Sequence, residues 1–338
     1  MTGKYLGHLG CDDPLYYYLQ NEILPQMAVA AKPARFRVFQ LSGSNAVYLY
    51  EDKYTGSRVV GKFFRSDRKG LEPDKAARLL EKEFYFLSLI RDHGLTLYPH
   101  YVVRPLGRNH ELNHLLVVEY CEGELLSEAI YAAIFRGAAG HLYRKLTALA
   151  YFLATLHNRT AKGTTIDFNE DCAYFDKLIT MLLGQNAISP PEAEELGQLR
   201  DQWRCQPCMW QDQQVLVHGD ATPNNFILGP GLAITAVDLE RAKHADRVFD
   251  VGRIAGELQH FFLQNTGRKY AAEPFIGHFL WEYACHFPDR MAAFLSITRR
   301  VPFHIGVTLL RIARNSWVSR EYCRRLINEA KNNLRSLP

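Results

Sequence analysis

The sequence contains no long uninterrupted run of apolar residues. A helix that crosses a bilayer needs roughly 18 or more such residues, so no membrane-spanning helix is expected. The opening residues M-T-G-K-Y-L-G-H-L-G also lack the apolar stretch and the small-residue cleavage site of a signal peptide. We therefore expect a soluble, cytoplasmic protein that does not act at a membrane.

Cysteine is scarce and does not occur at the spacings of a disulfide framework. The seven cysteines form an odd number and are spread from Cys11 to Cys323, which suits a reducing compartment. Cys205 and Cys208 have the C-x-x-C spacing of some zinc and redox sites, but no second pair follows them. We interpret most of the cysteines as packing residues.

Internal repeats, low-complexity linkers and readable RNA- or DNA-binding modules are also missing from the sequence. The formal net charge is only +4, so nucleic acid is not an expected partner. The chain does have 338 residues, of which 47% are hydrophobic, and this is enough to bury one large core or two moderate ones. Two lobes of unequal size would fit.

The period of the hydrophobic pattern changes near residue 120. Before this point, short runs rich in β-branched and aromatic residues lie between turn signals, which predicts strands. One helix over 73–91 interrupts them, with Pro73 suitably placed near its first turn. The predicted strands are 35–41, 46–50, 58–64, 101–105 and 115–120.

After Gly123 the pattern is mainly helical. The fold class that follows is α+β, with a small antiparallel-sheet lobe at 35–120 and a larger, mainly helical lobe at 121–338. Residues 1–34 are an N-terminal extension without a recognisable motif. The predicted elements are helices over 124–136, 140–158, 173–184 and 191–204, a strand pair at 225–229 and 233–238, and helices from about 247, 275 and 303 onward.

The strongest chemical signal is H-G-D-A-T-P-N-N-F at 218–226, which follows the apolar V-L-V and precedes a second apolar segment containing Asp238. Phosphoryl transfer between oxygens needs such a layout. The first acid, Asp220, would meet an acceptor hydroxyl. Asn225 and Asp238 would supply hard oxygen ligands to Mg²⁺ that bridges the phosphates of ATP. The alternative is an ordinary surface turn.

This segment resembles the catalytic loop of the aminoglycoside phosphotransferase and choline kinase family, small-molecule kinases with a protein-kinase-like two-lobed fold. The resemblance covers about residues 35–252. It implies that His218 orders the loop and that Asp250, in A-D-R-V-F-D-V-G, buttresses it. Many members carry His two residues after the catalytic Asp, where this chain has Thr222. That departure concerns acceptor positioning and not the metal chemistry.

An ATP-binding lobe is expected before this loop. A strand, turn and strand at 37–51 would cover phosphates with backbone N–H groups. Gly43, Ser44 and Asn45 in its turn resemble the family's version of the phosphate loop. A hairpin that binds no ligand would have the same pattern.

Lys62 lies in the otherwise apolar strand R-V-V-G-K-F-F, where a buried ammonium group must find anions. The phosphates of ATP would be such anions, and a carboxylate on the following helix would be its second partner. An apolar stripe on that helix runs from Ala76 to Ile90 at spacings of three and four, and Glu83 completes it. We therefore pair Lys62 with Glu83, against the alternative that both are solvated.

The strand at 115–120 leads into E-Y-C-E-G, which resembles the E-Y-x-x-G hinge of the family. Main-chain groups of Glu119 and Cys121 would hold adenine there. A protein kinase is the nearest rival interpretation. Only 12 residues separate Asp238 from Asp250, which leaves no room for a long activation segment, so a small acceptor is favoured over a peptide.

The sequence thus predicts an ATP-dependent phosphotransferase that uses Mg²⁺ and direct in-line transfer to a hydroxyl. Asp220 accepts or orients the hydroxyl proton, and Lys62, fixed by Glu83, clamps the phosphates. Glu240 either assists a second ion or forms a structural salt bridge. The complete set of these residues argues against a catalytically silent nucleotide-binding scaffold.

Positive charge concentrates in the C-terminal third, where 16 Lys or Arg stand against 8 Asp or Glu from Arg241 onward. Solvated helix faces would explain this excess, and so would a neutral or anionic acceptor. A pocket for polycationic aminoglycosides would present carboxylates. Arg299, Arg300, Arg311 and Arg314 instead recur at spacings that could gather on neighbouring turns. We expect a sugar-like acceptor that is neutral or anionic.

Overall fold

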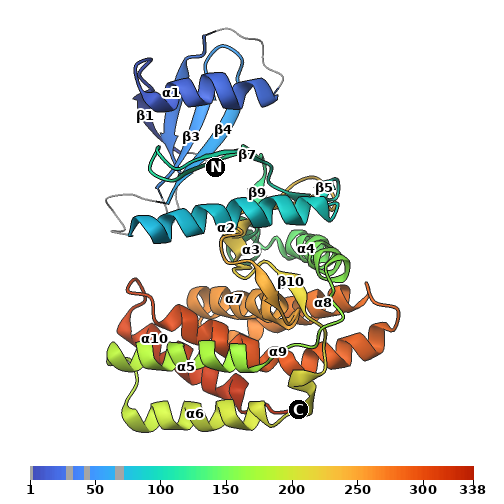
Figure 1. Cartoon of the computed structure of the whole chain (residues 1–338). Coiled ribbons are helices and arrows are strands. Elements are labelled where there is room, and N and C mark those ends of the chain that lie inside the picture. The colour runs from blue at the N-terminus through green and yellow to red at the C-terminus, as the bar shows by residue number, and fades with distance from the viewer. Residues whose placement is uncertain (1–2, 28–32, 42–45, 65–71) are drawn as a thin grey trace. The chain divides into compact units, whose positions relative to one another are not determined.

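The structure is a computed structural model that describes residues 3–27, 33–41, 46–64 and 72–338 (Figure 1). Its internal contacts divide the chain into two compact units. Unit 1 comprises residues 1–124 and 235–241, and unit 2 comprises residues 125–234 and 242–338. Within the described ranges, none of the helices combines the length and the apolarity that crossing a lipid bilayer requires.

Unit 1 is built on an antiparallel sheet in the order β1-β2-β3-β4-β8-β7. The pairing registers are regular along β2, β3, β4 and β8, in agreement with the alternating pattern of their sequences. The phosphate-loop residues Gly43, Ser44 and Asn45 lie outside the described residues. The strands are β1 (Lys4–His8), β2 (Phe36–Gln40), β3 (Ala46–Asp52), β4 (Arg58–Phe63), β7 (Pro105–Asn109) and β8 (Leu115–Glu119).

The predicted strand at 101–105 is wrong, because two strands share this segment. β6 (His100–Val102) pairs with β5 (Thr96–Leu97), whereas β7 begins at Pro105 and pairs with β8. Proline has no N–H to donate to a sheet, so it is tolerated at the first residue of an edge strand. Pro105 therefore separates the two strands, and β7 forms an edge of the sheet.

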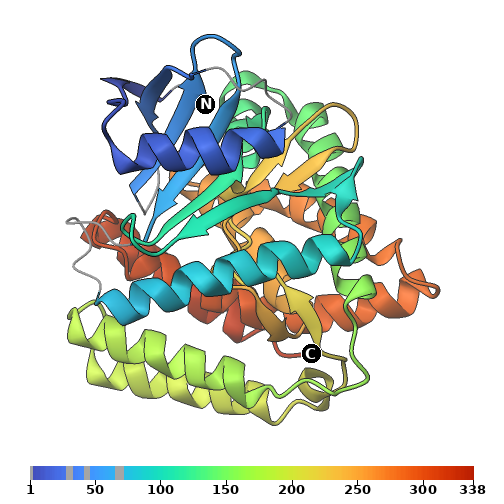
Figure 2. The same ribbon diagram turned by 45° about the horizontal axis from the view of Figure 1, so that its top comes forward.

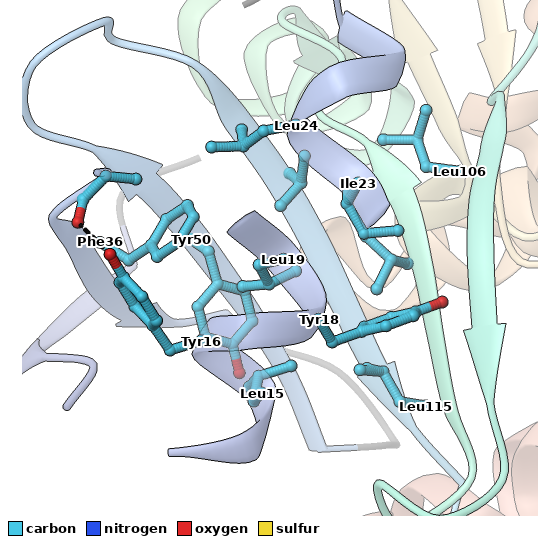
Figure 3. Packing of buried hydrophobic residues seen from close by; sticks show 13 residues of the cluster. Leu15, Tyr16, Tyr18, Leu19, Ile23, Leu24, Phe36, Tyr50, Leu106 and Leu115 are labelled. Carbon is cyan, nitrogen blue, oxygen red and sulfur yellow. Dashed lines mark hydrogen bonds between the residues drawn. The ribbon is translucent and has the colours of Figure 1, made fainter. Parts of the chain in front are cut away.

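Residues 4–27, to which the sequence assigns no motif, contribute an edge strand and a covering helix to unit 1. β1 pairs with β2, and α1 (Pro14–Tyr18) continues through a π-helical turn (Leu19–Ile23) and a tighter 3-10 turn (Leu24–Met27). Figure 3 shows these turns packed on one face of the sheet. Each fully buried large apolar side chain contributes roughly 1.5–3 kcal/mol. The buried cluster consists of Leu15, Tyr16, Tyr18, Leu19, Ile23, Leu24, Ala34, Phe36, Tyr50, Val59, Leu106, Leu115 and Val117.

The opposite face of the sheet carries Lys62. Side chains alternate along a strand, so Lys62 faces away from the side on which Val59 joins the buried cluster. The helix α2 (Pro73–Asp92) contacts the sheet through β7 and β8, as Figure 2 shows, and buries Glu83 with its apolar stripe. The predicted helix over 73–91 is confirmed.

Unit 2 is mainly helical, and the predicted fold class, α+β with an antiparallel sheet followed by a helical part, is confirmed. Its short strands are β10 (Val215–Val217), β11 (Phe226–Leu228) and β13 (Lys243–Ala245), and β12 (Ile234–Ala236) and β9 (Glu124–Leu125) span the unit boundary. Its helices are α3 (Leu126–Arg136), α4 (Ala139–Arg159), α5 (Asn169–Gly184), α6 (Pro190–Arg204), α7 (Val248–Thr266), α8 (Glu273–Ala284), α9 (Arg290–Ala313) and α10 (Arg320–Leu334).

The prediction of a helix from about 303 is wrong in its start, because α9 begins at Arg290 and contains Pro302. An interior proline costs about 3 kcal/mol or more, since it removes one hydrogen bond and clashes with the preceding turn. In α9 the buried residues around it, such as Val301 and Phe303, offset this cost by packing. Tertiary burial thus extends the helix across its proline.

Two glycines bring α7 and α9 into close contact. A Cβ atom at Gly252 would lie 2.3 Å from Cβ of His304, and one at Gly256 would lie 2.7 Å from Cβ of Thr308. Only a residue without a side chain fits at either place. Because the two helices come so close here, the side chains next to Gly252 and Gly256 on α7 lie beside side chains of α9.

A pH-dependent contribution to stability is expected from Glu192 in the first turn of α6. Its carboxylate accepts the Ser189 N–H at 2.9 Å and contacts Arg324 at 3.1 Å. The Ser189 hydrogen bond, followed by Arg324 and Lys331, lowers its pKa from 4.5 to about 2. Because the folded pKa is depressed, this contribution is present above pH 4.5 and disappears as the pH falls toward about 2.

We therefore expect Glu192→Gln to destabilise unit 2 by about 1 kcal/mol at pH 7, the usual value of a helix cap. The difference from the wild type should shrink steadily between pH 5 and pH 2.5, as urea titrations would measure. Glu194→Gln is the matched control, since Glu194 is exposed on the same helix. A difference that is constant over this pH range would contradict the role of the charge.

Candidate functional site

Unit 1 holds a cluster of one ammonium group and three carboxylates. Lys62 on β4 donates to Glu83 on α2 at 2.6 Å, to Asp238 at 2.6 Å and to Glu240 at 3.1 Å. Lys62 and Glu83 are both buried, at 8% and 3% exposure. The predicted contact between Lys62 and Glu83 is therefore present, and the segment 235–241 adds two further acids to it.

The electrostatics of this cluster favour a further cation. Burial opposes the charge of Lys62, but Glu83, Asp238 and Glu240 outweigh it and raise the pKa of the ammonium group. Burial raises the pKa of Glu83 to about 7, so the cluster carries an excess of between one and two negative charges near neutral pH. Carboxylate oxygens of Glu83, Asp238 and Glu240 lie within 4.8 Å of one another. Such hard oxygen ligands suit Mg²⁺, so these residues fit the predicted metal.

Asp238 has an uncommon backbone conformation, with φ at +63°. Non-glycine residues in this left-handed region cost about 1–3 kcal/mol and cluster at functional sites. Asp and Asn tolerate the region better than most residues. The conformation turns the chain at the point where both Asp238 and Glu240 contact Lys62.

In unit 2, Asp250 holds the backbone of the catalytic-loop motif. Its carboxylate is fully buried at the start of α7 and accepts the N–H of His218 at 2.6 Å and of Gly219 at 3.0 Å. Gly219 has φ at +78°, which explains the glycine in His-Gly-Asp. Burial opposes ionisation of Asp250, but hydrogen bonds from His157 and from the His218 backbone outweigh it and lower its pKa. The predicted contact between Asp250 and the loop is present.

His157 on α4 is a member of this arrangement that sequence reasoning missed. Its Nε2 lies 3.3 Å from Asp250, and its Nδ1 lies 2.7 Å from the hydroxyl of Tyr283 on α8. Burial, the largest effect, lowers its pKa. A histidine on the apolar face of α4 is the only sequence signal, because its partners lie 93 and 126 residues further along the chain.

Asn225 is placed by the same loop. Its side-chain nitrogen donates to the carbonyl oxygen of Asp220 at 2.8 Å, and the residue is 9% exposed. His218 contributes as well, since the backbone nitrogen of Asp220 donates to its Nδ1 at 3.4 Å. An amide that donates through its nitrogen keeps its oxygen as the group that would ligate a metal.

The carboxylate of Asp220 contacts two arginines. Arg253 on α7 donates from Nη1 to Oδ1 at 3.2 Å, and Nη1 of Arg311 on α9 lies 3.7 Å from the same oxygen. Arg311 also donates to the buried Glu257 on α7. Sequence reasoning named Arg311 but missed Arg253 and Glu257, which lie beside Gly252 and Gly256 where α7 meets α9.

The four arginines expected to gather are separated by the structure. Arg300 is buried and bridges Asp212 and Asp246, each at 2.6 Å, so its role is structural. Arg299 is exposed, and Nη1 of Arg314 lies 3.4 Å from Sδ of Met181. Of the four, only Arg311 contacts Asp220.

The predicted hinge residues lie at the end of β8. The N–H of Glu119 donates to the carbonyl oxygen of Arg104 at 3.0 Å, and its side chain accepts from the hydroxyl of Tyr101 at 2.6 Å. Glu119 would therefore meet adenine through its own carbonyl oxygen and not through its N–H. Burial raises the pKa of the Cys121 thiol to about 12, so this thiol is a poor nucleophile.

The comparisons with known proteins identify a family and a fold. The model of a phosphotransferase enzyme family (APH) matches residues 36–284. A search of curated protein sequences finds no match. Solved structures with the same fold include choline kinase from Cryptosporidium parvum Iowa II, with a TM-score of 0.62, 11% identity and coverage of 95% of this chain and 94% of that one.

Two further structures are similar over nearly the whole chain. Plasmodium vivax ethanolamine kinase has a TM-score of 0.59 at 13% identity, with 96% of this chain and 89% of that one covered. ADP-bound aminoglycoside phosphotransferase APH(2'')-Ib has a TM-score of 0.53 at 14% identity, with 96% and 98% covered. The predicted protein-kinase-like fold is thereby confirmed.

Proposed function

We propose, because this chain belongs to the phosphotransferase enzyme family, that it transfers the γ-phosphoryl group of Mg·ATP to a hydroxyl of a small molecule that is sugar-like and neutral or anionic. The observation that carries the proposal is the cluster in which Lys62 contacts Glu83, Asp238 and Glu240. A buried ammonium group among three acids suits phosphates and a divalent cation.

Each residue has a role in this proposal. Lys62, fixed by Glu83, binds the phosphates of ATP, and Asp220 accepts or orients the proton of the acceptor hydroxyl. Asp238 and Asn225 are the proposed magnesium ligands, and Glu240, which contacts Lys62, is available as a further oxygen ligand. When bound, Mg²⁺ supplies charge neutralisation of the triphosphate.

The backbone groups of the loop complete the arrangement. Asp250 and His218 fix the backbone at and before Asp220, which positions the residue that carries the proposed catalytic carboxylate. Main-chain groups of Glu119 and Cys121 would bind adenine, and Gly43, Ser44 and Asn45 would cover the phosphates. Transfer is in line: the hydroxyl oxygen forms a bond to the γ-phosphorus as the bond from that phosphorus to the β–γ bridging oxygen breaks, so that ADP leaves and the hydroxyl proton passes toward Asp220.

The proposed class of acceptor follows from the charged groups around Asp220. The similar structures include a choline kinase, an ethanolamine kinase and an aminoglycoside phosphotransferase, and choline, ethanolamine and aminoglycosides all carry amino or ammonium groups. In this chain Arg253 and Arg311 contact the carboxylate proposed to meet the acceptor. An acceptor ammonium group near them would meet like charges in a partly dry site.

A screen of ATP consumption with hydroxylated metabolites, sugars and aminoglycosides tests the proposal. We expect Mg-dependent release of ADP with at least one sugar-like compound. For kanamycin-type aminoglycosides we expect a kcat/KM well below about 10⁴ M⁻¹s⁻¹, the lower end of the ordinary enzyme range. A value at or above that figure would make aminoglycoside phosphorylation the better assignment. Absence of Mg-dependent turnover with every hydroxyl compound would reject phosphotransfer itself.

Loop positioning by Asp250 gives a separate prediction about stability. Asp250→Asn keeps the shape but replaces one acceptor oxygen with a donor that opposes the N–H of His218 or Gly219. Hydrogen bonds to a charged group are worth roughly 1.5–3 kcal/mol, so we expect a loss of about 2–4 kcal/mol in the free energy of unfolding. All four tryptophans, from Trp203 to Trp317, lie in unit 2, so urea unfolding followed by their fluorescence measures this loss. Asp176→Asn, at a surface ion pair with Arg200, should change stability by less than about 1 kcal/mol.

A further inference from the structure

We propose that Arg253 and Arg311 form the binding site for an anionic group of the acceptor, a carboxylate or a phosphate, that lies beside the reacting hydroxyl. We call these two residues the arginine pair. The inference rests on the proposed function, because it takes Asp220 as the residue that meets the hydroxyl. It goes further in naming the chemical group that the enzyme recognises.

The arginine pair lies at the carboxylate that is proposed to meet the acceptor hydroxyl. Both members of the arginine pair contact Oδ1 of Asp220, at 3.2 Å for Arg253 and 3.7 Å for Arg311. A hydroxyl that donates to the Asp220 carboxylate therefore brings the neighbouring atoms of its own molecule to these guanidinium groups. The substituent next to the reacting hydroxyl is the one that they would bind.

Within the residues that the structure describes, the arginine pair uses few of its hydrogen-bond donors. A guanidinium group carries five N–H donors, so the arginine pair offers ten. In the described part of the chain, Arg253 donates one hydrogen bond, to Asp220, and Arg311 donates one, to Glu257. The Nε atom of Arg311 is buried and has no hydrogen-bond partner. Buried donors left without partners are costly, which indicates a site prepared for an oxygen-rich ligand.

Arg300 provides an internal comparison. It lies on α9 as Arg311 does, and its side chain is 1% exposed. Arg300 donates through all three nitrogens, to Asp246, to Asp212 and to two atoms of Ser296. Among the described residues, the structural Arg300 thus uses four of its five N–H donors, whereas each member of the arginine pair, at 3% and 13% side-chain exposure, uses one.

The charges at the arginine pair also favour an anionic ligand. Burial, followed by the nearby charge of Arg311, lowers the pKa of Arg253 to about 10. Burial of Arg311 is outweighed by Glu257 and Asp220, which raise its pKa, so Arg253 is the less compensated of the two. The two acids in contact, Asp220 and Glu257, engage only part of each guanidinium group. An anion that accepts from both arginines relieves their mutual repulsion, and a planar carboxylate or a phosphate matches the fork of N–H groups. An ammonium group in the same place would be repelled by both.

The first test measures anion binding without requiring turnover. Thermal unfolding of the full chain, free of nucleotide, is followed at constant ionic strength while chloride is replaced by phosphate, acetate or galacturonate. We expect at least one of these anions to raise the Tm of the wild type by about 2 °C or more. The rise should be the same in Arg299→Gln, an exposed position on the same helix, and should be lost in Arg311→Gln.

Two further variants separate binding from folding. Arg311→Gln combined with Glu257→Gln removes the ion pair as a unit, so that no buried charge loses its partner. Arg311→Lys keeps the charge but not the fork, and should retain less than half of the anion effect on Tm. An anion effect as large in the Arg311→Gln variants as in the wild type overturns the inference, and so does a wild type that responds to none of the three anions.

The second test uses sets of acceptors that differ in one substituent. Galacturonate, galactose and galactosamine form one set, glycerate and glycerol a second, and galactose 6-phosphate represents the phosphate arm. We expect the kcat/KM of the preferred anionic member to exceed that of its neutral partner by at least about thirtyfold, the lower range for a buried charge contact. Arg311→Gln should abolish that preference and Arg299→Gln should keep it. Equal use of neutral or cationic members overturns the inference while leaving phosphotransfer in place.

Discussion

Asp220→Asn is expected to lower kcat by at least about 10³-fold, because a general base contributes roughly 10²–10⁴-fold and this carboxylate also orients the acceptor. Asn keeps the size of the side chain and most of its packing, whereas Ala would leave Arg253 and Arg311 facing a void. The affinity for Mg·ATP should stay within about tenfold of the wild type, since the proposed role of Asp220 concerns the acceptor and not the nucleotide.

Single-turnover assays and calorimetry with Mg·ATP would separate these two quantities. Asp176→Asn removes a carboxylate from the surface of unit 2 and should leave both unchanged. Turnover above a few per cent of the wild-type rate in Asp220→Asn would show that another group serves the acceptor hydroxyl. A large loss of nucleotide affinity would instead place Asp220 at the phosphates.

The contacts of the candidate site that the sequence predicted are those whose chemistry is local or periodic. Asp220 and Asn225 lie in one short segment, and the structure shows the direct hydrogen bond between them. Glu83 was identifiable because an acid on an apolar stripe must have a buried partner, and Lys62 in an apolar strand raised the same question. Lys62 and Glu83 each needed a buried partner of opposite charge, so each indicated the other as that partner.

The residues that the sequence did not reveal depend on contacts between helices. Arg253 and Glu257 look like ordinary charged positions until α7 and α9 meet at Gly252 and Gly256. His157 likewise takes its meaning from Asp250, on another helix. Periodicity assigns a side chain to a face of its helix, but it does not say which helix packs against that face.

The errors in the fold have physical causes as well. Pro302 lies inside α9 because burial of the residues on both sides of it outweighs the lost hydrogen bond. The helix propensities of single residues do not include the energy of this burial. The strand β1 is exposed along most of its length, so it lacks the alternating apolar pattern that marks the inner strands. Its place in the sheet comes from pairing with β2.

Asp238→Asn is expected to abolish the dependence of nucleotide binding on magnesium. Asn is the suitable replacement because Asp238 has φ at +63°, a conformation that Asn tolerates and that would strain Ala. The substitution thus removes one negative charge and one carboxylate oxygen while the backbone is preserved. Lys62 keeps its contacts with Glu83 and Glu240, so the buried ammonium group is not left alone.

The presence and the absence of Mg²⁺ give opposite expectations for how tightly the variant binds ATP relative to the wild type. With Mg²⁺ the wild type should bind ATP at least about 100-fold more tightly than the variant, because the metal needs hard oxygen ligands to neutralise the triphosphate. With EDTA the variant should bind ATP at least as tightly as the wild type, since a carboxylate that repels the phosphates is gone. Calorimetric titrations in both conditions measure the four affinities. Glu81→Gln, on the exposed side of α2 beside His110, is the control for loss of a carboxylate in unit 1. If Asp238→Asn retained the full gain in affinity from Mg²⁺, the metal site would have to be assigned to other oxygen ligands.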